Sequence, residues 1–219
     1  MTQCCEAKAS ELGALHERQK RVLYMVLAIN LSMFVVEVVA GVLARSTALL
    51  ADSLDMLGDT LVYGLSLYAV GRGVRWRASA ALVKGLVMGG FGLAVLAGAL
   101  YGFRRPVLPV AEMMGGIGFL ALIANLSCLG LLWRCRSDDL NLRSAWLCSR
   151  NDVIANTAVL GAAAGVWAFG TSWPDLIVGA GIAALFLRSA QQVVANAAQE
   201  LRKNRQSAQG VGSPGERSV

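Results

Sequence analysis

Acidic residues recur at helical spacing inside an apolar stretch of this chain. Asp52, Asp55 and Asp59 follow one another at intervals of three and four residues, which would place them on one face of a helix. A carboxylate at the centre of a bilayer costs roughly 2.5–3.5 kcal/mol, and such residues ordinarily mark a path for ions or protons. Three of them together repel one another unless protons or a cation neutralise the group. The stripe therefore predicts a site that binds cations or protons.

A second polar stripe lies later in the chain. Cys148, Asp152 and Asn156 are four residues apart, again on one face of a helix. If this helix faces the first stripe, Cys148 and Asp152 complete a set of four ligands, the number that zinc prefers. A lone cysteine in an apolar helix is more often a packing residue, and this alternative stays open. The predicted metal ligands are Asp55, Asp59, Cys148 and Asp152, with Asn156 as a candidate accessory.

Three further polar residues are candidates for supporting roles. Asp52 stands nearest to the start of its stretch, where it is as suited to capping or gating the helix as to ligation. Glu37 and Asn30 are seven residues apart, hence on one face, and are predicted to line a water-filled cavity. Arg150 stands two residues before Asp152 and so points elsewhere on its helix. It either pairs with Glu37 or Asp52 or reaches an interface.

Candidate ligands also occur before the first apolar stretch. Cys4 and Cys5 are adjacent, and paired thiols bind soft metals, so they are a candidate capture site for metal ions. The alternative is two incidental thiols on a mobile tail. The single histidine, His16, is predicted to be a solvated surface residue.

The two stripes need helices that cross a membrane, and the composition provides them. Hydrophobic residues make up 56% of the 219 residues and charged residues only 16%. Soluble domains usually carry about a quarter charged residues, and a spanning helix needs about 20 mostly apolar ones. The predicted spans are 22–44, 48–70, 82–103, 111–133, 144–168 and 174–190. The predicted fold class is therefore all-α, a polytopic membrane protein with a bundle of six transmembrane helices.

Positive charges divide unequally between the two sides of these spans. Sixteen Lys and Arg residues lie on the side of the termini, and three, Arg45, Arg104 and Arg105, lie in the opposite loops. Because positively charged loops stay in the cytoplasm, both termini are predicted to be cytoplasmic. The net charge of +6 then reflects topology and not binding to nucleic acid. The predicted regions are a cytoplasmic arm (1–21), a six-span transport domain (22–190) and a short, partly disordered cytoplasmic tail (191–219).

Several segments that carry these polar residues match a family pattern. They are 30–37, Gly41, 46–59, Asn125, 141–145, Asp152 and 173–175. On these residues the chain resembles the cation diffusion facilitator family of metal/proton antiporters. The resemblance covers residues 22–190 and implies six helices, cytoplasmic termini, a homodimer and one transport site between the second and fifth spans. It assigns that site to Asp55, Asp59, Cys148 and Asp152.

Two departures from the family pattern have consequences. Many members have His where this chain has Cys148, and often His in place of Asp55, so that no imidazole is available here. A thiolate favours softer ions such as zinc or cadmium over manganese or magnesium. Members also usually carry a soluble metal-binding domain after the sixth span. We expect a short form without it.

Three classes of function are consistent with carboxylates in membrane spans. A secondary transporter that exports zinc- or cadmium-like ions in exchange for protons accounts for both stripes. An intramembrane metal-dependent hydrolase would normally need histidine ligands, and the spans contain no histidine. A membrane metal sensor or adaptor would leave the paired carboxylates unexplained. We therefore expect a transporter of the bacterial inner membrane, not an enzyme and without a cofactor, whose partners are metal ions, protons, lipid and a second copy of itself.

Overall fold

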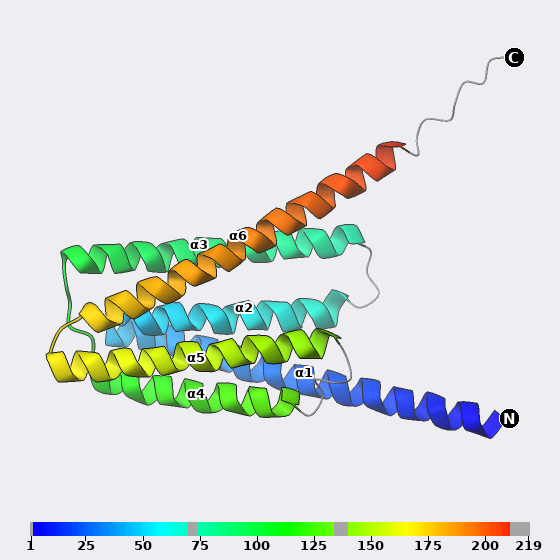
Figure 1. Cartoon of the computed structure of the whole chain (residues 1–219), viewed down its shortest axis with the longest axis horizontal. Helices are drawn as coiled ribbons and strands as arrows, with labels where there is room; N and C mark the ends of the chain where they lie inside the picture. Colours follow the sequence, from blue (N-terminus) through cyan, green and yellow to red (C-terminus); the bar gives the residue numbers. More distant parts are fainter. Residues whose placement is uncertain (1, 70–73, 134–139, 211–219) are drawn as a thin grey trace, which may run out of the picture.

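The described part of the chain folds into six helices, seen in the computed structural model of Figure 1. They are α1 (Thr2–Ala44), α2 (Thr47–Ala69), α3 (Val74–Arg104), α4 (Ala111–Trp133), α5 (Leu140–Phe169) and α6 (Trp173–Gly210). The structure describes residues 2–69, 74–133 and 140–210, and the side chains of residues 21–61, 64, 79–133, 152–199, 201 and 202. The all-α prediction is confirmed over these ranges.

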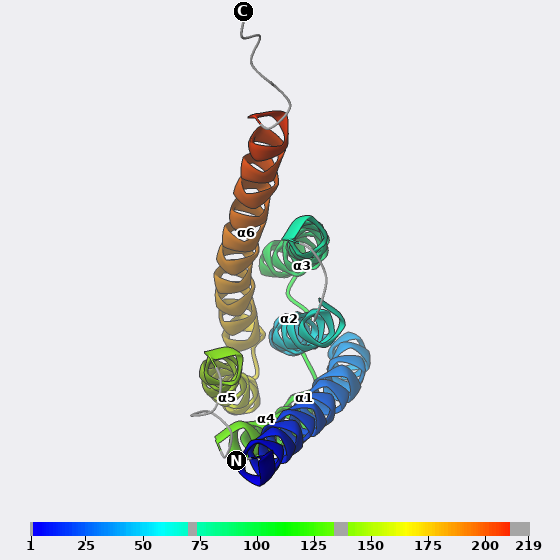
Figure 2. The ribbon, with the colours of Figure 1, turned by 90° about the vertical axis from the view of Figure 1, so that its right-hand side faces the viewer.

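The helices pack as a ring with α2 drawn towards its middle (Figure 2). Around the ring the order is α1, α2, α3, α6, α5, α4 and back to α1, and α2 also packs against α5 and α6 across it. Helices that follow one another in sequence run in opposite directions (Figure 1). The first turns of α1 and the last turns of α6 therefore leave from the same end, here named the terminal end. The opposite end, named the loop end, holds residues 45–46, 105–110 and 170–172.

Within the described residues, five helices are long and apolar enough to cross a membrane. Their candidate spans are Arg21–Ala44, Ser79–Arg104, Ala111–Trp133, Asp152–Phe169 and Trp173–Gln199. The remaining helix, α2, carries the three aspartates, and its described side chains are those of residues 47–61 and 64. It packs against α1, α3, α5 and α6, so its carboxylates can face protein in place of lipid. The prediction of a polytopic helical membrane protein is confirmed, with α2 packed against four of the other helices.

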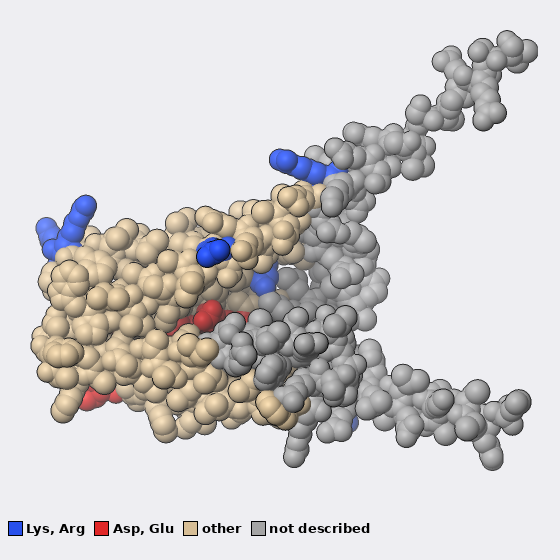
Figure 3. Space-filling model, in the orientation of Figure 1, with Lys and Arg blue, Asp and Glu red and all other residues tan. Residues whose placement is uncertain are grey.

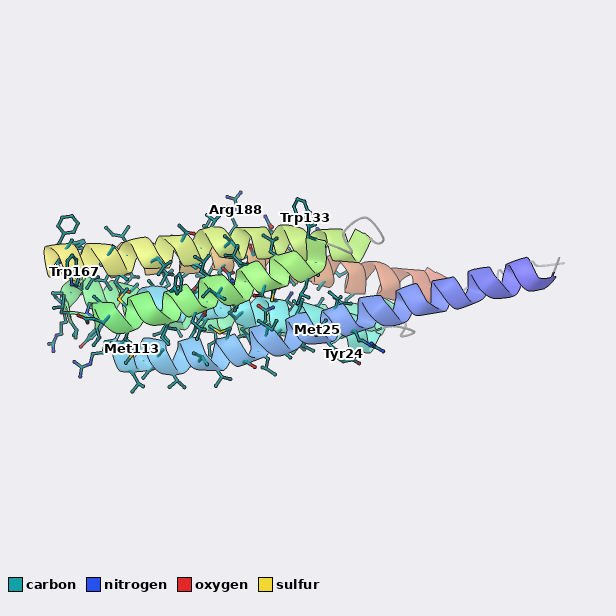
Figure 4. The ribbon with its side chains drawn as sticks, turned by 90° about the horizontal axis from the view of Figure 1, so that it is seen from below. Tyr24, Met25, Met113, Trp133, Trp167 and Arg188 are labelled. Carbon is teal, nitrogen blue, oxygen red and sulfur yellow. The ribbon has the colours of Figure 1, made fainter. Side chains whose placement is uncertain are left out.

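Aromatic side chains mark both ends of the bundle. Trp167 is 75% exposed near the loop end, and Trp133 is 53% exposed towards the terminal end (Figure 4). Tyr24 is also exposed on the terminal side of α1. Exposed aliphatic side chains such as Val39 and Leu93 lie on the outer surface of the helices. Since Trp and Tyr collect at membrane–water interfaces, this pattern is that of a bundle standing across a bilayer.

A tight turn joins α1 to α2 at the loop end. Arg45 adopts a left-handed conformation with φ of 54°, and the Ser46 N–H donates to the Gly41 carbonyl at 2.9 Å. This bond satisfies a carbonyl that the end of α1 would otherwise leave free. The Ser46 hydroxyl then accepts from the Leu49 N–H at 3.1 Å and caps α2. The capping role considered for Asp52 is therefore wrong, because Ser46 holds that position.

The start of α2 is also held by the first turn of α6. Asp175 Oδ1 accepts from the Ser46 hydroxyl at 2.6 Å and from the Ala48 N–H at 3.0 Å, and Oδ2 accepts from the Thr47 N–H at 2.8 Å. A carboxylate at this position satisfies free N–H groups and complements the helix dipole. Asp175 is 1% exposed, so water does not compete for these bonds. They fix the loop end of α2 to α6, and we name them the Asp175 clasp.

Gly179 lets α6 lie directly on the backbone of α2. A Cβ added there would fall 2.7 Å from the Thr47 carbonyl carbon and 2.8 Å from the Ala48 nitrogen. Gly179→Ala is therefore expected to push the two helices apart and lower the thermal midpoint of the purified protein by roughly 5 °C. The control is Gly181→Ala, where an added Cβ meets nothing within 4 Å. An equal loss of stability in both variants would contradict the close approach.

Candidate functional site

Polar side chains collect in the interior between α1, α2, α4 and α5. The buried members with described side chains are Asn30 and Glu37 on α1, Asp52 and Asp59 on α2, Asn125 on α4, and Asp152 and Asn156 on α5. Each belongs to a helix that is otherwise largely apolar, so only packing of these helices against one another shields the polar groups from lipid. Asp152 and Asn156 of the second predicted stripe therefore face the same interior as Asp52 and Asp59 of the first.

The Asp59 and Asp152 carboxyls meet at the interface of α2 and α5. They form a hydrogen bond with each other, and each residue is 7% exposed. Asp152 Oδ2 has no hydrogen-bond partner within the described ranges. A hydrogen bond between two carboxyls requires a proton on one of them, and a metal cation is the other species that can hold the two together. This contact joins the two predicted stripes and is the centre of the candidate site.

Asp55 connects this buried pair with the outside of the bundle. It stands one turn before Asp59 on α2 and opens onto a cavity of about 580 Å³ between α5 and α6. The other lining residues are Ile154, Ala155, Ala158, Ile182, Leu185, Phe186, Arg188, Ser189 and Gln192. Figure 3 shows acidic side-chain atoms in the middle of this face of the molecule. Arg188, on the terminal side of the cavity, points away from the bundle (Figure 4).

Asp52 is held by α5 at a different level of the interior. Asn156 Nδ2 donates to both Asp52 carboxylate oxygens at 3.1 Å, and both residues are fully buried. The other end of the amide, Asn156 Oδ1, has no hydrogen-bond partner among the described residues. Asn156, predicted as an accessory, thus contacts Asp52 and not the pair formed by Asp59 and Asp152.

Helices α1 and α4 add polar groups to this interior. Glu37 and Asn30 are both buried, which confirms that they share the inward face of α1. Asn30 Nδ2 lies 3.9 Å from Cys128 Sγ on α4. Cys128 is a free, fully buried cysteine within electrostatic range of Asp59 and Asp152. Sequence reasoning missed it because a single cysteine in an apolar helix is ordinarily a packing residue.

The complete predicted ligand set is not assembled in the described side chains. Among them, no three His, Cys, Asp or Glu residues converge closely enough to hold a metal ion. The geometry gives a reason, since Asp55 faces the cavity and Asp52 is bonded to Asn156. Five predicted or weighed residues have side chains outside the described ranges: Cys4, Cys5, His16, Cys148 and Arg150. The set of Asp55, Asp59, Cys148 and Asp152 stays a prediction.

Three curated proteins are similar to this chain. It is 27% identical over 181 residues to the metal cation efflux system protein CzcD of Cupriavidus metallidurans, covering 75% of this chain and 57% of that protein. It is 29% identical over 198 residues to the zinc transporter ZitB of Escherichia coli, covering 83% and 62%. It is 26% identical over 191 residues to the cadmium, cobalt and zinc/H(+)-K(+) antiporter of Bacillus subtilis, covering 80% and 60%. The chain spans about three fifths of the length of these relatives.

A family match covers the bundle itself. Residues 23–202 match the cation efflux transmembrane domain, a stretch that includes both polar stripes and most of the six helices. The match is to a transport domain and not to an enzyme, and it confirms the resemblance seen in the sequence. The chain belongs to the cation efflux family.

Proposed function

We propose that this protein moves divalent metal cations, zinc or cadmium foremost, out of the cytoplasm in exchange for protons. The observation that carries the proposal is the buried hydrogen bond between Asp59 and Asp152, which joins α2 to α5 in the interior. Neither carboxyl can stay charged there at low cost unless a proton or a cation neutralises it. The relatives named for efflux of metal cations, zinc transport and cadmium, cobalt and zinc antiport support the choice of cargo.

The same groups can hold either a proton or a metal ion, but not both at once. Metal ligands bind in their deprotonated forms, so a cation that enters between Asp59 and Asp152 displaces the proton they share. Asp55 stands one turn before Asp59 on α2, and Cys148 precedes Asp152 by four residues in the sequence, so we assign both as further ligands of an ion at the pair. Three carboxylates and a thiolate form a mixed oxygen and sulfur set suited to zinc and cadmium. Exchange at shared ligands couples metal movement to proton movement.

The shape of the bundle supports loading from the terminal end. The cavity at Asp55 extends along α6 towards Arg188 and Gln192 on that side. Towards the loop end, the interior is filled by a tightly packed apolar cluster that includes Leu49, Met114 and Val159. A cation could therefore reach the pair from the terminal end, which the positive charges predict to be cytoplasmic. Release on the other side then needs separation of the helices at the loop end, an alternating-access movement.

Transport by purified protein in proteoliposomes tests this proposal. Zinc or cadmium uptake should be faster into vesicles with an acidic interior than into vesicles at equal pH, and a protonophore should remove the difference. Falling external pH should slow uptake, because protons then compete with the metal for the same ligands. Uptake that ignores the pH gradient would contradict proton exchange. Metal binding without any flux would favour the sensor or adaptor alternative.

The sulfur ligand has a separate test. Cys148→Ser is expected to weaken cadmium binding more than zinc binding, because a hydroxyl is a poor partner for the softer ion. Cys148→His should restore zinc binding, since imidazole is a good zinc ligand. Isothermal titration of both variants with both metals measures the effect, with Cys128→Ser as the comparison. Cadmium loss in Cys128→Ser alone would transfer the sulfur role to α4, and no loss in either variant would remove sulfur from the proposed ligand set.

A further inference from the structure

The buried polar residues form two layers along the bundle. The pair of Asp59 and Asp152 lies nearer the terminal end, and a second group lies nearer the loop end. That group consists of Glu37 on α1, Asp52 on α2 and Asn156 on α5, and we name it the loop-side layer. Along α2, seven residues separate Asp52 from Asp59, a rise of about 10 Å.

Apolar side chains enclose the loop-side layer from both ends along α1 and α2, and from the loop end along α5. Towards the terminal end, Met33, Met56 and Ala121 pack together as one cluster, and Met33 and Met56 stand one turn from Glu37 and Asp52. Towards the loop end, each member of the layer has a neighbour one turn away in another common cluster. These neighbours are Ala40 on α1, Ala48 on α2 and Val159 on α5. The cluster at the loop end therefore brings the three polar side chains to one level of the interior.

Three oxygens of this layer, two on Glu37 and one on Asn156, lack protein donors among the described residues. Glu37 is 0% exposed, and neither of its carboxylate oxygens has a hydrogen-bond partner in the described part of the chain. Glu37 is within electrostatic range of Asp52. Asn156 Oδ1, at the other end of the amide that bonds Asp52, is likewise buried without a partner. Burying so many acceptors without donors is costly. A cation among them would satisfy all of these acceptors.

From this geometry we propose a second cation site in the loop-side layer, where Glu37, Asp52 and Asn156 Oδ1 bind the divalent metal after it leaves the main site. This inference rests on the proposed function. One divalent cation balances the charges of the two carboxylates, and no Lys or Arg is among the buried side chains that the structure describes. The donors are all oxygen, so they hold zinc or cadmium more weakly than a set that includes a thiolate. A weaker second position lets the ion move on towards the loop end.

Counting bound zinc on the purified full chain in detergent tests the second site. Equilibrium dialysis against radioactive zinc should show two ions per chain for the wild type, one bound more tightly than the other. Glu37→Gln should keep the tighter ion and raise the Kd of the weaker one at least about 10-fold. Asp152→Asn should do the reverse, because it removes a ligand of the main site. Two ions with unchanged affinities in Glu37→Gln would overturn the second site.

Further variants separate the alternatives. Glu37→Asp keeps a carboxylate and should retain both ions, which shows that loss in Glu37→Gln is not a packing defect. Glu112→Gln, which alters an exposed carboxylate at the start of α4, should also retain both. If Glu37→Gln does not fold, Asn156→Ala provides the measurement, and unchanged affinity for the weaker ion overturns the proposal. One zinc per wild-type chain contradicts the second site alone, whereas no zinc contradicts the proposed function.

Discussion

Asp152→Asn is expected to abolish metal transport by the reconstituted protein while leaving the fold intact. The amide has nearly the same shape as the carboxyl, so packing at the interface of α2 and α5 is preserved. It carries no negative charge and cannot give up a proton to make room for a metal ion. Loss of one direct ligand should lower the initial rate of zinc uptake into proteoliposomes by at least about 100-fold. Asp59→Asn and Asp55→Asn are expected to have similar effects.

The control for this result is a carboxylate outside the interior. Glu112 is exposed in the first turn of α4, and Glu112→Gln should transport at the wild-type rate. Size-exclusion profiles and thermal midpoints of all variants show whether they are folded. Near-normal flux in a folded Asp152→Asn protein would remove Asp152 from the site, and with it the role proposed for its contact with Asp59.

The positions of the helices could be predicted because the bilayer requires long apolar runs. The stretch 111–133 predicted for the fourth span has the bounds of α4 itself, Ala111–Trp133. The stretch 82–103 falls short of α3, which begins at Val74, because hydropathy detects only the apolar part of a helix. In the same way α6 continues past the predicted span to Gly210. Polar turns that extend a helix beyond the membrane leave no hydropathy signal.

The pairing of the site residues was only partly predictable. Helical spacing predicted that Asp52 and Asp59 share a face of α2 and that Asp152 and Asn156 share a face of α5, and these four side chains are buried in the interior. It did not show that Asp52 would bond to Asn156 or that Asp55 would open onto the cavity next to α6. Those contacts depend on how each helix is rotated and on its offset along its neighbour. Both are set by packing between elements far apart in sequence, such as Met33 of α1 against Met56 of α2.

The Asp175 clasp is the contact that sequence reasoning missed most completely. Capping signals in sequence are local, because a cap normally lies within a few residues of the N–H groups it accepts from. Asp175 satisfies the start of a helix that precedes it by 129 residues at Ser46. In the sequence, Asp175 is an acidic residue in the first turn of α6. At that position its charge is explained by a favourable interaction with the dipole of its own helix, which gives no indication of a partner on α2. Its partner becomes clear only once α6 crosses α2.

Asp175→Ala is expected to be the most destabilising single substitution outside the carboxylate interior. It would leave the Ser46 hydroxyl and the N–H groups of Thr47 and Ala48 without their acceptor at the loop end of α2. Each lost partner costs about 1–3 kcal/mol when buried, so the thermal midpoint should fall by roughly 10 °C or more. Asp175→Asn is the matched variant, since its remaining carbonyl oxygen can still accept from some of these three donors. Its thermal midpoint should fall by about half as much as that of Asp175→Ala. Equal midpoints for the Ala and Asn variants, or a change below about 2 °C in both, would show that the clasp does not hold α2 in place.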